Sequence, residues 1–338
     1  MRISVLAGLI VFACSLAATA QHYTISGRIP FDGDAGWDYL FADSMHGQLF
    51  VSHGTEVEVV DMTSDKPIAK ITGMKRIHGI AIANDLNRGF ISDGGDDAVI
   101  IFDLNSRAVL QKVPTGKNPD GILFDPHSRR VFAFNGRSND ATVIDAASGK
   151  VVGTIPLDGK PEFPASDAKG NVYVNIEDKS EIAQLDPDHL KVKKVWSLSP
   201  CEEPSGLAID LEARRLFSVC SNNKMAVVDA DSGQVVTTVA IGHGPDAAAY
   251  DPSNKLVFSS NGEGTLTVVK QDSPNKYTVL APVSTERSAR TMALDTKTDK
   301  IYLSAAKFGA TPEASAANPH PRPTIVPGSF HLLVLSPQ

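Results

Sequence analysis

The side chains with the clearest chemical potential are acidic residues that recur at equivalent places in a repeating pattern. Each place lies five residues before an Asp or Asn that we expect to end a β-strand. The seven places hold Asp38, Gly79, Asp120, Glu162, Ser205, Asp246 and Arg290. Trp37 and His78 stand directly before the first two. If the fold brings these places together, four carboxyl groups share one polar site with an arginine and a histidine.

A site of this kind needs a counter-charge. Two carboxylates about 8 Å apart repel each other by roughly 2 kcal/mol at an effective dielectric of about 20. Arg290 and His78 offset part of this repulsion, and a bound cation or the cationic group of a ligand would offset the rest. Oxygen ligands favour calcium or magnesium. Without a cation, carboxyl pKa values rise, and a carboxyl can then act as a general acid or base.

Two alternatives stand beside this interpretation. Asp120 and Asp246 each follow a proline, so both could simply cap turns. His53 and His78 fall in neighbouring repeats at the same expected face, and together with Asp120 and Asp246 they would suit a transition metal. A cation held by the carboxylates would polarise a carbonyl while His78 moves a proton, which is the chemistry of a hydrolase or lyase.

The first twenty residues predict a cleaved signal peptide. Arg2 gives the positive start, Ser4–Ala13 is an apolar run, and Ala18–Ala20 matches an A-x-A cleavage site. The run is shorter than the about 20 residues that span a membrane. We therefore expect residues 1–20 to be removed and residues 21–338 to form one periplasmic or secreted domain without a transmembrane segment. A lipoprotein signal at Cys14 is the alternative.

Export leaves two cysteines in the mature chain, Cys201 and Cys220. Two thiols in an oxidising compartment most simply form one disulfide. The repeat pattern places both at the same rim of one unit, which suits disulfide geometry. A thiolate metal site with His53 or His243 is the alternative, although no Cys-x-x-Cys spacing supports it.

The composition indicates an ordinary folded chain with many turns. The 338 residues are 42% hydrophobic, which is enough for a core, whereas disordered chains have low hydrophobicity. The 26 glycines and 21 prolines favour turns over long helices. The net charge of -7 argues against nucleic acid as a partner, because proteins that bind it are usually basic.

The elements that must position the polar residues are repeated units of short β-strands. An aromatic residue recurs at intervals of 40 to 44 residues, each followed by a turn, a β-branched run that usually ends in Asp, and a further strand. The aromatics are Phe50, Phe90, Phe132, Tyr173, Phe217, Phe258 and Tyr302. Four short strands per repeat, with no helical periodicity, are typical of a propeller blade. The sequence therefore predicts an all-β, seven-bladed β-propeller.

The two ends of the chain predict how the ring closes. The last repeat has three strands, and Tyr23–Pro30 is a lone strand ahead of the first full repeat. We expect this N-terminal strand to complete the last blade, because the pairing removes two open sheet edges.

Several local motifs give the repeats a family resemblance. The tetrapeptides Tyr173–Ile176 (YVNI) and Phe50–His53 (FVSH), the Asp-Pro turns at Asp125 and Asp251, and the Val-Ile-Asp strands resemble those of the YVTN-type, YncE-like exported seven-bladed propellers. The resemblance covers essentially all of the mature chain and implies the propeller fold. It implies no single activity, because this fold hosts lactonases, lyases, cofactor-bearing oxidoreductases and plain scaffolds.

We expect a monomeric propeller that binds a small polar ligand or an exported protein partner at its acidic face. Asp38, Asp120, Glu162, Asp246 and Arg290 would supply the polar contacts, and Trp37 an apolar wall. The rival is a metal-dependent, lactonase-like hydrolase or lyase with a divalent cation, calcium or magnesium, held by carboxylates in the central channel.

The longest departure from the repeat is the proline-rich insertion Lys307–Ser329 in the last unit. By its register it belongs to the same face as the acidic residues. Loops of this length are usually functional or disordered, so a lid or docking arm and a plain surface loop are both compatible with the sequence.

Overall fold

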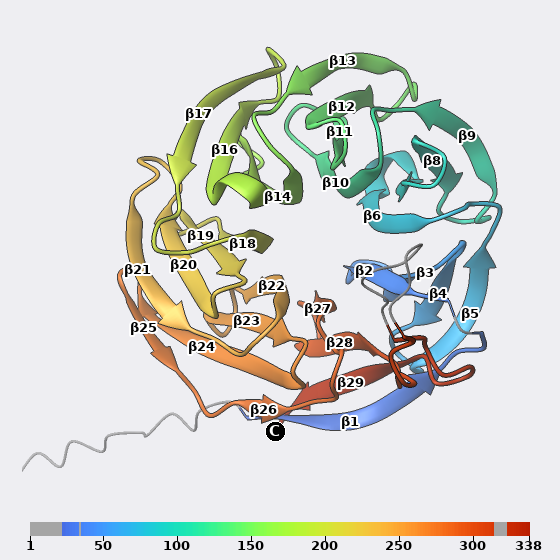
Figure 1. Cartoon of the computed structure of the whole chain (residues 1–338). Helices are drawn as coiled ribbons and strands as arrows, with labels where there is room; N and C mark the ends of the chain where they lie inside the picture. The colour runs from blue at the N-terminus through green and yellow to red at the C-terminus, as the bar shows by residue number, and fades with distance from the viewer. Residues whose placement is uncertain (1–21, 34, 314–322) are drawn as a thin grey trace, which may run out of the picture.

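Seven small sheets stand around a common axis in the part of the chain that the structure describes (Figure 1). The structure is a computed structural model that describes residues 22–33, 35–313 and 323–338. The predicted signal peptide lies outside the described residues. Successive blades follow one another around the ring in chain order, as the colour sequence in Figure 1 shows. The prediction of an all-β, seven-bladed propeller is confirmed.

Each blade is an antiparallel sheet that runs from the axis outward. The innermost strands are β2 (Trp37–Asp43), β6 (Ile77–Ala83), β10 (Pro119–Asp125), β14 (Pro161–Ser166), β18 (Pro204–Asp210), β22 (Pro245–Asp251) and β27 (Met292–Asp295). The second strands are β3 (Gln48–His53), β7 (Arg88–Asp93), β11 (Arg130–Asn135), β15 (Val172–Ile176), β19 (Arg215–Cys220), β23 (Leu256–Asn261) and β28 (Lys300–Ala305). The third strands are β4 (Glu56–Asp61), β8 (Ala98–Asp103), β12 (Asp140–Asp145), β16 (Glu181–Asp186), β20 (Lys224–Asp229), β24 (Thr265–Ser273) and β29 (His331–Pro337).

The outer strands complete the blades. They are β5 (Lys66–Ile71), β9 (Val109–Pro114), β13 (Val151–Pro156), β17 (Lys191–Ser197), β21 (Val235–Ala240), β25 (Lys276–Val279) and, in the last blade, β1 (Tyr23–Pro30). The short strand β26 (Val283–Ser284) also pairs with β24. Two short 3-10 turns, η1 (Asn84–Leu86) and η2 (Glu177–Lys179), interrupt connections between strands.

The ring closes through its N-terminal strand, as predicted. The last sheet has the order β1-β29-β28-β27, so the first strand of the chain lies beside the last one. Their antiparallel register runs from Tyr23 opposite Pro337 to Pro30 opposite His331. Because β29 would otherwise be an open edge, this pairing joins the two ends of the molecule without leaving that strand unpaired.

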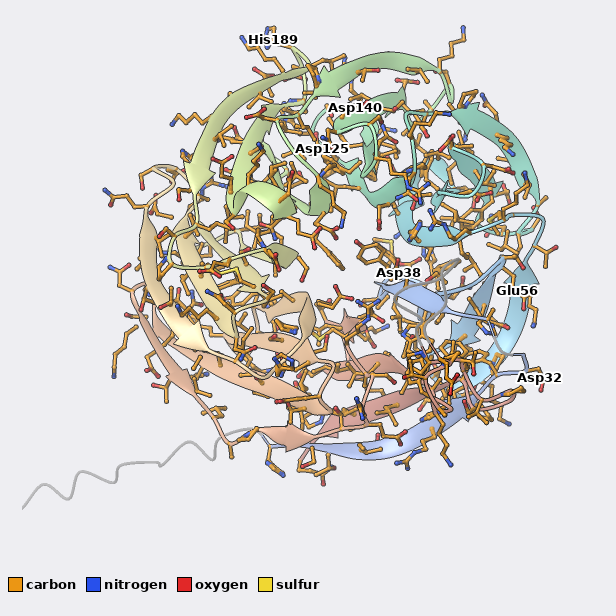
Figure 2. The ribbon with its side chains drawn as sticks, in the orientation of Figure 1. Asp32, Asp38, Glu56, Asp125, Asp140 and His189 are labelled. Atoms are coloured by element: carbon orange, nitrogen blue, oxygen red, sulfur yellow. A yellow bond between two sulfur atoms is a disulfide. The ribbon has the colours of Figure 1, made fainter. Side chains whose placement is uncertain are left out.

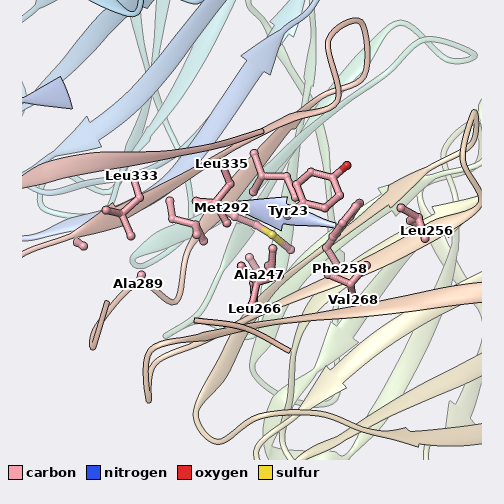
Figure 3. Close-up of a cluster of buried hydrophobic side chains, with 14 residues drawn as sticks. Tyr23, Ala247, Leu256, Phe258, Leu266, Val268, Ala289, Met292, Leu333 and Leu335 are labelled. Atoms are coloured by element: carbon pink, nitrogen blue, oxygen red, sulfur yellow. The ribbon is translucent and has the colours of Figure 1, made fainter. Parts of the chain in front are cut away.

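The repeated aromatic residues form the core between blades. Each of the seven that define the repeat is fully buried, with an exposed fraction of 0%. The clusters that they join combine side chains from two neighbouring blades. In Figure 3, Phe258 and Leu266 of one blade pack with Leu333 and Leu335 of the next, and Tyr23 of the closing strand meets Phe258 edge-on at 5.2 Å. The same residues that set the sequence period therefore hold adjacent blades together.

The aspartates that end the third strands shape the turns. The Asp145 carboxylate accepts a hydrogen bond from the backbone N–H of Ser148 at 2.7 Å, and Asp229 does the same with Ser232 at 2.8 Å. The next residue in each turn is a glycine with positive φ, 69° at Gly149 and 78° at Gly233. The Asp-x-x-Ser-Gly sequence thus supplies both the cap and the left-handed residue that a tight turn requires.

The structure confirms the disulfide between Cys201 and Cys220, whose Cα atoms are 5.7 Å apart. It ties the loop that enters β18 to the end of β19 in the same blade. Among the described residues, no helix has the length and apolarity that a membrane crossing demands.

Candidate functional site

Irregular pairing of the innermost strands positions the predicted site residues. In six blades the register with the second strand shifts near the start of the innermost strand. The residues between the shifted pairs include Asp38, His78, Asp120, Glu162 and Asp246. An irregularity of this kind bends a strand and re-aims a side chain. In the seventh blade, Arg290 precedes the strand β27.

Small polar side chains from the second strands fasten these segments. The Ser52 hydroxyl accepts a hydrogen bond from the backbone N–H of Asp38 at 2.8 Å. Ser92 accepts one from the N–H of Gly79 at 2.8 Å and donates to the carbonyl of Asp120, in the next blade, at 2.6 Å. These bonds satisfy backbone groups that the irregular pairing would leave unpaired, and they fix neighbouring blades relative to each other.

Asp38, His78 and Asp120 meet on three consecutive blades. The Nδ1 atom of His78 lies 2.6 Å from Oδ2 of Asp38 and 3.7 Å from Oδ1 of Asp120. One ligand atom from each residue lies within 4.8 Å of the others. Figure 2 shows Asp38 at the inner end of its blade, close to the axis of the ring. This cluster therefore lies beside the central axis of the ring.

Two ion pairs continue the polar site around the ring. Arg290 Nη1 lies 2.7 Å from Oδ2 of Asp246. Lys160 Nζ lies 2.7 Å from Oε1 of Glu162 and also contacts Glu177. We call Asp38, His78, Asp120, Glu162 and Asp246, together with Arg290 and Lys160, the acidic mouth.

Burial and mutual repulsion raise the carboxyl pKa values of the acidic mouth. Burial first, and then the charge of Asp120, raise the pKa of Glu162 to about 8 against the opposing charge of Lys160. Burial raises the pKa of Asp246 to about 7. The charge of Arg290 opposes this shift, and the charges of Asp38 and Asp120 add to it. Because Glu162 and Asp246 both respond to the charge of Asp120, carboxyl groups of different blades share one electrostatic environment.

His78 and Asp120 titrate in the same environment. Burial raises the pKa of Asp120, and the neighbouring His78 opposes that shift. For His78, burial alone would lower the pKa, but the hydrogen bond to Asp38 and the charges of Asp120 and Asp38 outweigh it, so the pKa is raised. A protonated His78 is thus a counter-ion for the two aspartates beside it.

Aromatic side chains line the mouth on two sides. The Tyr39 ring meets Phe163 edge-on at a centroid distance of 4.2 Å. Trp37 stacks on Phe330 at 5.2 Å and lies 6.1 Å from Phe308, the second residue of the proline-rich insertion. Trp37 is half-buried, in keeping with a wall beside the polar groups.

The described part of the insertion borders the mouth. Lys307 and Phe308 line a cavity of about 840 Å³ with Arg287 and Arg290. A single bridge joins Phe308 to Ile325 at the base of the insertion. Its residues His320 and Arg322 lie outside the described residues.

His53 does not lie with His78. It is 2% exposed, stacks on Phe330 at 4.4 Å and forms a separate cluster with Glu56 and Glu58. Lys70 Nζ lies 2.8 Å from a carboxylate oxygen of each of these two glutamates. The labelled Glu56 stands farther from the axis than Asp38 in Figure 2. The predicted ligand set of His53, His78, Asp120 and Asp246 is thus divided between two places.

Sequence reasoning missed Lys160 and Tyr39 as parts of the site. Lys160 and Tyr39 carried a usable signal, since Lys160 stands two residues before Glu162 and Tyr39 directly follows Asp38. Glu177 comes directly after the second strand of its blade, a place that the repeat register predicts on the same face, and the structure pairs it with Lys160.

The comparisons with known proteins agree with the fold. No family model matches the chain. The uncharacterized protein YncE of Escherichia coli strain K12 is 24% identical to this chain over 141 residues, which are 38% of this chain and 40% of YncE. The protein of the same name from Escherichia coli O157:H7 is 23% identical over 141 residues, with the same two coverages. The match thus spans about two fifths of these relatives' length. It supports the predicted resemblance to YncE-like propellers.

Solved structures resemble the chain over almost all of its length. A chain in the crystal structure of a mitotic checkpoint complex has a TM-score of 0.75 at 12% identity and covers 99% of this chain and 98% of its own. The structure of U3-55K has a TM-score of 0.74 at 10% identity, with 88% of this chain and 95% of that one covered. At such identities the likeness shows the propeller fold alone.

Proposed function

We propose that this YncE-like seven-bladed β-propeller is a binding module whose acidic mouth takes a small polar ligand that carries a cationic group. The observation that supports this most directly is the convergence of Asp38, His78 and Asp120 from three blades. Asp120 also lies close enough to Glu162 and to Asp246 to raise the pKa of each. A cationic group would relieve this repulsion while the carboxyl groups stay ionised.

The charges around the site favour a cation over an anion. The four carboxyl groups, together with Glu177 beside Lys160, outnumber the cations Arg290, Lys160 and His78. The raised pKa values of Glu162 and Asp246 mean that protons neutralise part of this surplus until a cation binds. Lys160 is further engaged by Glu177. An anionic ligand would be repelled by the buried carboxylates. Its attraction to the cations would not offset this repulsion, because these cations are already engaged in ion pairs.

Export fits the proposal. We propose that residues 1–20 are a cleaved leader and that residues 21–338 are the mature, monomeric propeller in the periplasm or outside the cell. The Cys201–Cys220 disulfide supports this, because disulfides persist in oxidising compartments. A protein partner at the same mouth would use the same groups, with a lysine or arginine side chain as the cation.

Binding can be tested with simple probes. We expect calorimetric titration to detect methylammonium binding to the mature protein and no binding of acetate. The double variant Asp120→Asn/Asp246→Asn should lose methylammonium binding, because both changes remove negative charge while keeping side-chain shape. Asp188→Asn, which neutralises an exposed aspartate paired with His127 elsewhere, is the control and should bind normally. Undiminished affinity in the double variant would contradict the proposed site.

A second candidate is a metal-dependent hydrolase or lyase. The three ligand atoms of Asp38, His78 and Asp120 lie close enough together to hold one ion, and their mixed nitrogen and oxygen donors fit zinc or another transition metal better than calcium. A bound ion would polarise a carbonyl, and Asp38 would orient the His78 ring. Elemental analysis of protein purified without chelator, with thermal shifts in calcium, magnesium, zinc and copper, separates the candidates. If the protein holds no stoichiometric metal and none of these ions shifts its melting temperature, the metal-dependent enzyme is ruled out.

A further inference from the structure

An apolar cavity, which we call the channel, is lined by residues that directly follow those of the acidic mouth. A cavity of about 240 Å³ lies between the innermost strands β2, β6, β10 and β14. Aromatic and aliphatic side chains dominate its lining, among them Tyr39, Phe41, Ile80, Ile122, Phe124 and Phe163. None of these side chains carries a charge, so the cavity contrasts sharply with the carboxyl groups at its entrance.

The channel and the mouth are built from adjacent residues of the same strands. Tyr39 follows Asp38, Gly79 follows His78, and Phe163 follows Glu162, and all three of these second residues line the cavity. A Cβ atom at Gly79 would lie 2.8 Å from Ile122 and 3.1 Å from the Asp120 carbonyl oxygen. Glycine is therefore what allows neighbouring strands to approach at the level where the polar mouth meets the apolar channel.

Tyr39 marks the boundary between the two regions. Its ring packs edge-on against Phe163 in the channel, while its hydroxyl responds to the charges of the mouth. Burial and the charges of Asp120, Glu162, Asp38 and Asp246 raise the pKa of Tyr39 well above its usual value. The phenol is thus a neutral donor among carboxyl groups, at the point where an amphipathic ligand would change from polar to apolar.

We infer that the ligand is an amphipathic cation, an organic ammonium whose charged head lies among Asp38, Asp120, Glu162 and Asp246 and whose apolar chain or ring enters the channel. This inference rests on the proposed function, since it assigns the cation of that proposal a chemical class. A bare metal ion or a purely polar amine would leave the apolar lining in contact with water. Burying an attached hydrocarbon chain there removes that lining from water as well.

A chain-length series tests the inference on the intact mature protein. We would measure the affinities of methylammonium, butylammonium and hexylammonium by calorimetric titration, with hexanol and hexanoate as the uncharged and anionic counterparts. Each methylene that enters the channel should strengthen binding by about fourfold, the factor expected for burying one CH₂ group. Hexanol and hexanoate should each bind much more weakly than hexylammonium, because they lack the charge that the mouth selects.

A variant pair locates the chain within the molecule. Phe163→Ala should weaken hexylammonium binding by at least about threefold more than it weakens methylammonium binding, because only the longer chain extends along the ring. Leu110→Ala removes an apolar side chain that is 52% exposed on the outer strand β9, and it should change neither affinity. The wild-type series alone still tests the inference if Phe163→Ala fails to fold.

The outcomes separate this inference from the proposed function. If methylammonium binds and its affinity does not change with chain length, the channel takes no part and the inference is overturned while the proposed function stands. Hexanol binding as tightly as hexylammonium would also overturn it, since the charge would then be irrelevant. If no ammonium binds at all, the proposed function itself fails.

Discussion

Replacing Glu162 with glutamine should make the protein more stable, and only at neutral to alkaline pH. Glu162 is buried beside Asp120, and its pKa is raised from 4.5 to about 8. Its ionised form is therefore disfavoured in the folded protein relative to the unfolded chain. Glutamine has nearly the same shape, keeps an oxygen that can accept a hydrogen bond from Lys160, and carries no charge at any pH.

The sign and size of the effect follow from the shift. A carboxyl group with a raised folded-state pKa contributes stability that is fully present below pH 4.5 and is lost as the pH rises through about 8. The Glu162→Gln variant does not undergo this loss. Each pKa unit corresponds to about 1.4 kcal/mol, so the full shift sets an upper limit of about 5 kcal/mol. Because Glu162 shares its ionisation with Asp120, we expect about half of that.

The assay is urea unfolding of both proteins below pH 4.5 and above pH 8. The difference in their free energy of unfolding should be small at the acidic end and should grow to a few kcal/mol in favour of the variant at the alkaline end. Glu177→Gln is the matched control, since it neutralises the other glutamate that contacts Lys160. For Glu177→Gln we expect the difference in free energy of unfolding from the wild type to grow much less between acidic and alkaline pH. A constant difference between wild type and Glu162→Gln across the whole range would refute the reasoning.

The remaining predictions concern the scaffold. Tyr23→Ala should destabilise the protein by about 3 to 5 kcal/mol in urea unfolding, because Tyr23 is 1% exposed and packs against Phe258 on the strand that closes the ring. The control is Ser26→Ala, on the exposed side of the same strand, which should change the free energy of unfolding little. A cost near that of Ser26→Ala would show that closure does not depend on this contact. The free energy of unfolding of the double variant Cys201→Ser/Cys220→Ser should be about 3 kcal/mol lower than that of the wild type, as expected for a crosslink between residues 19 apart. Equal stability of the two proteins under oxidising conditions would count against a structural role for the disulfide.

The candidate site was predictable in part. The repeat register alone singled out the equivalent positions in the seven blades, because blades of one design carry equivalent residues to the same face. The same register could not show that His53 turns away from His78 into a cluster with Glu58 and Lys70. That outcome depends on the direction of one side chain at a strand end, where residues a single position apart face opposite sides of the sheet.

The sequence by itself determined the seven blades and the closing strand, because aromatic spacing, Asp-capped turns and an unmatched N-terminal strand are local features that repeat. It also determined the disulfide, since only one pair of cysteines follows the predicted leader. Only the tertiary structure decided which charges meet. The distances between strands and blades bring Lys160 to Glu162 and Glu177, and Arg290 to Asp246. They also form the apolar channel. A linear pattern does not encode those distances. Electrostatic interactions fall with separation in space, so residues far apart along the chain become one site only when folding closes the ring.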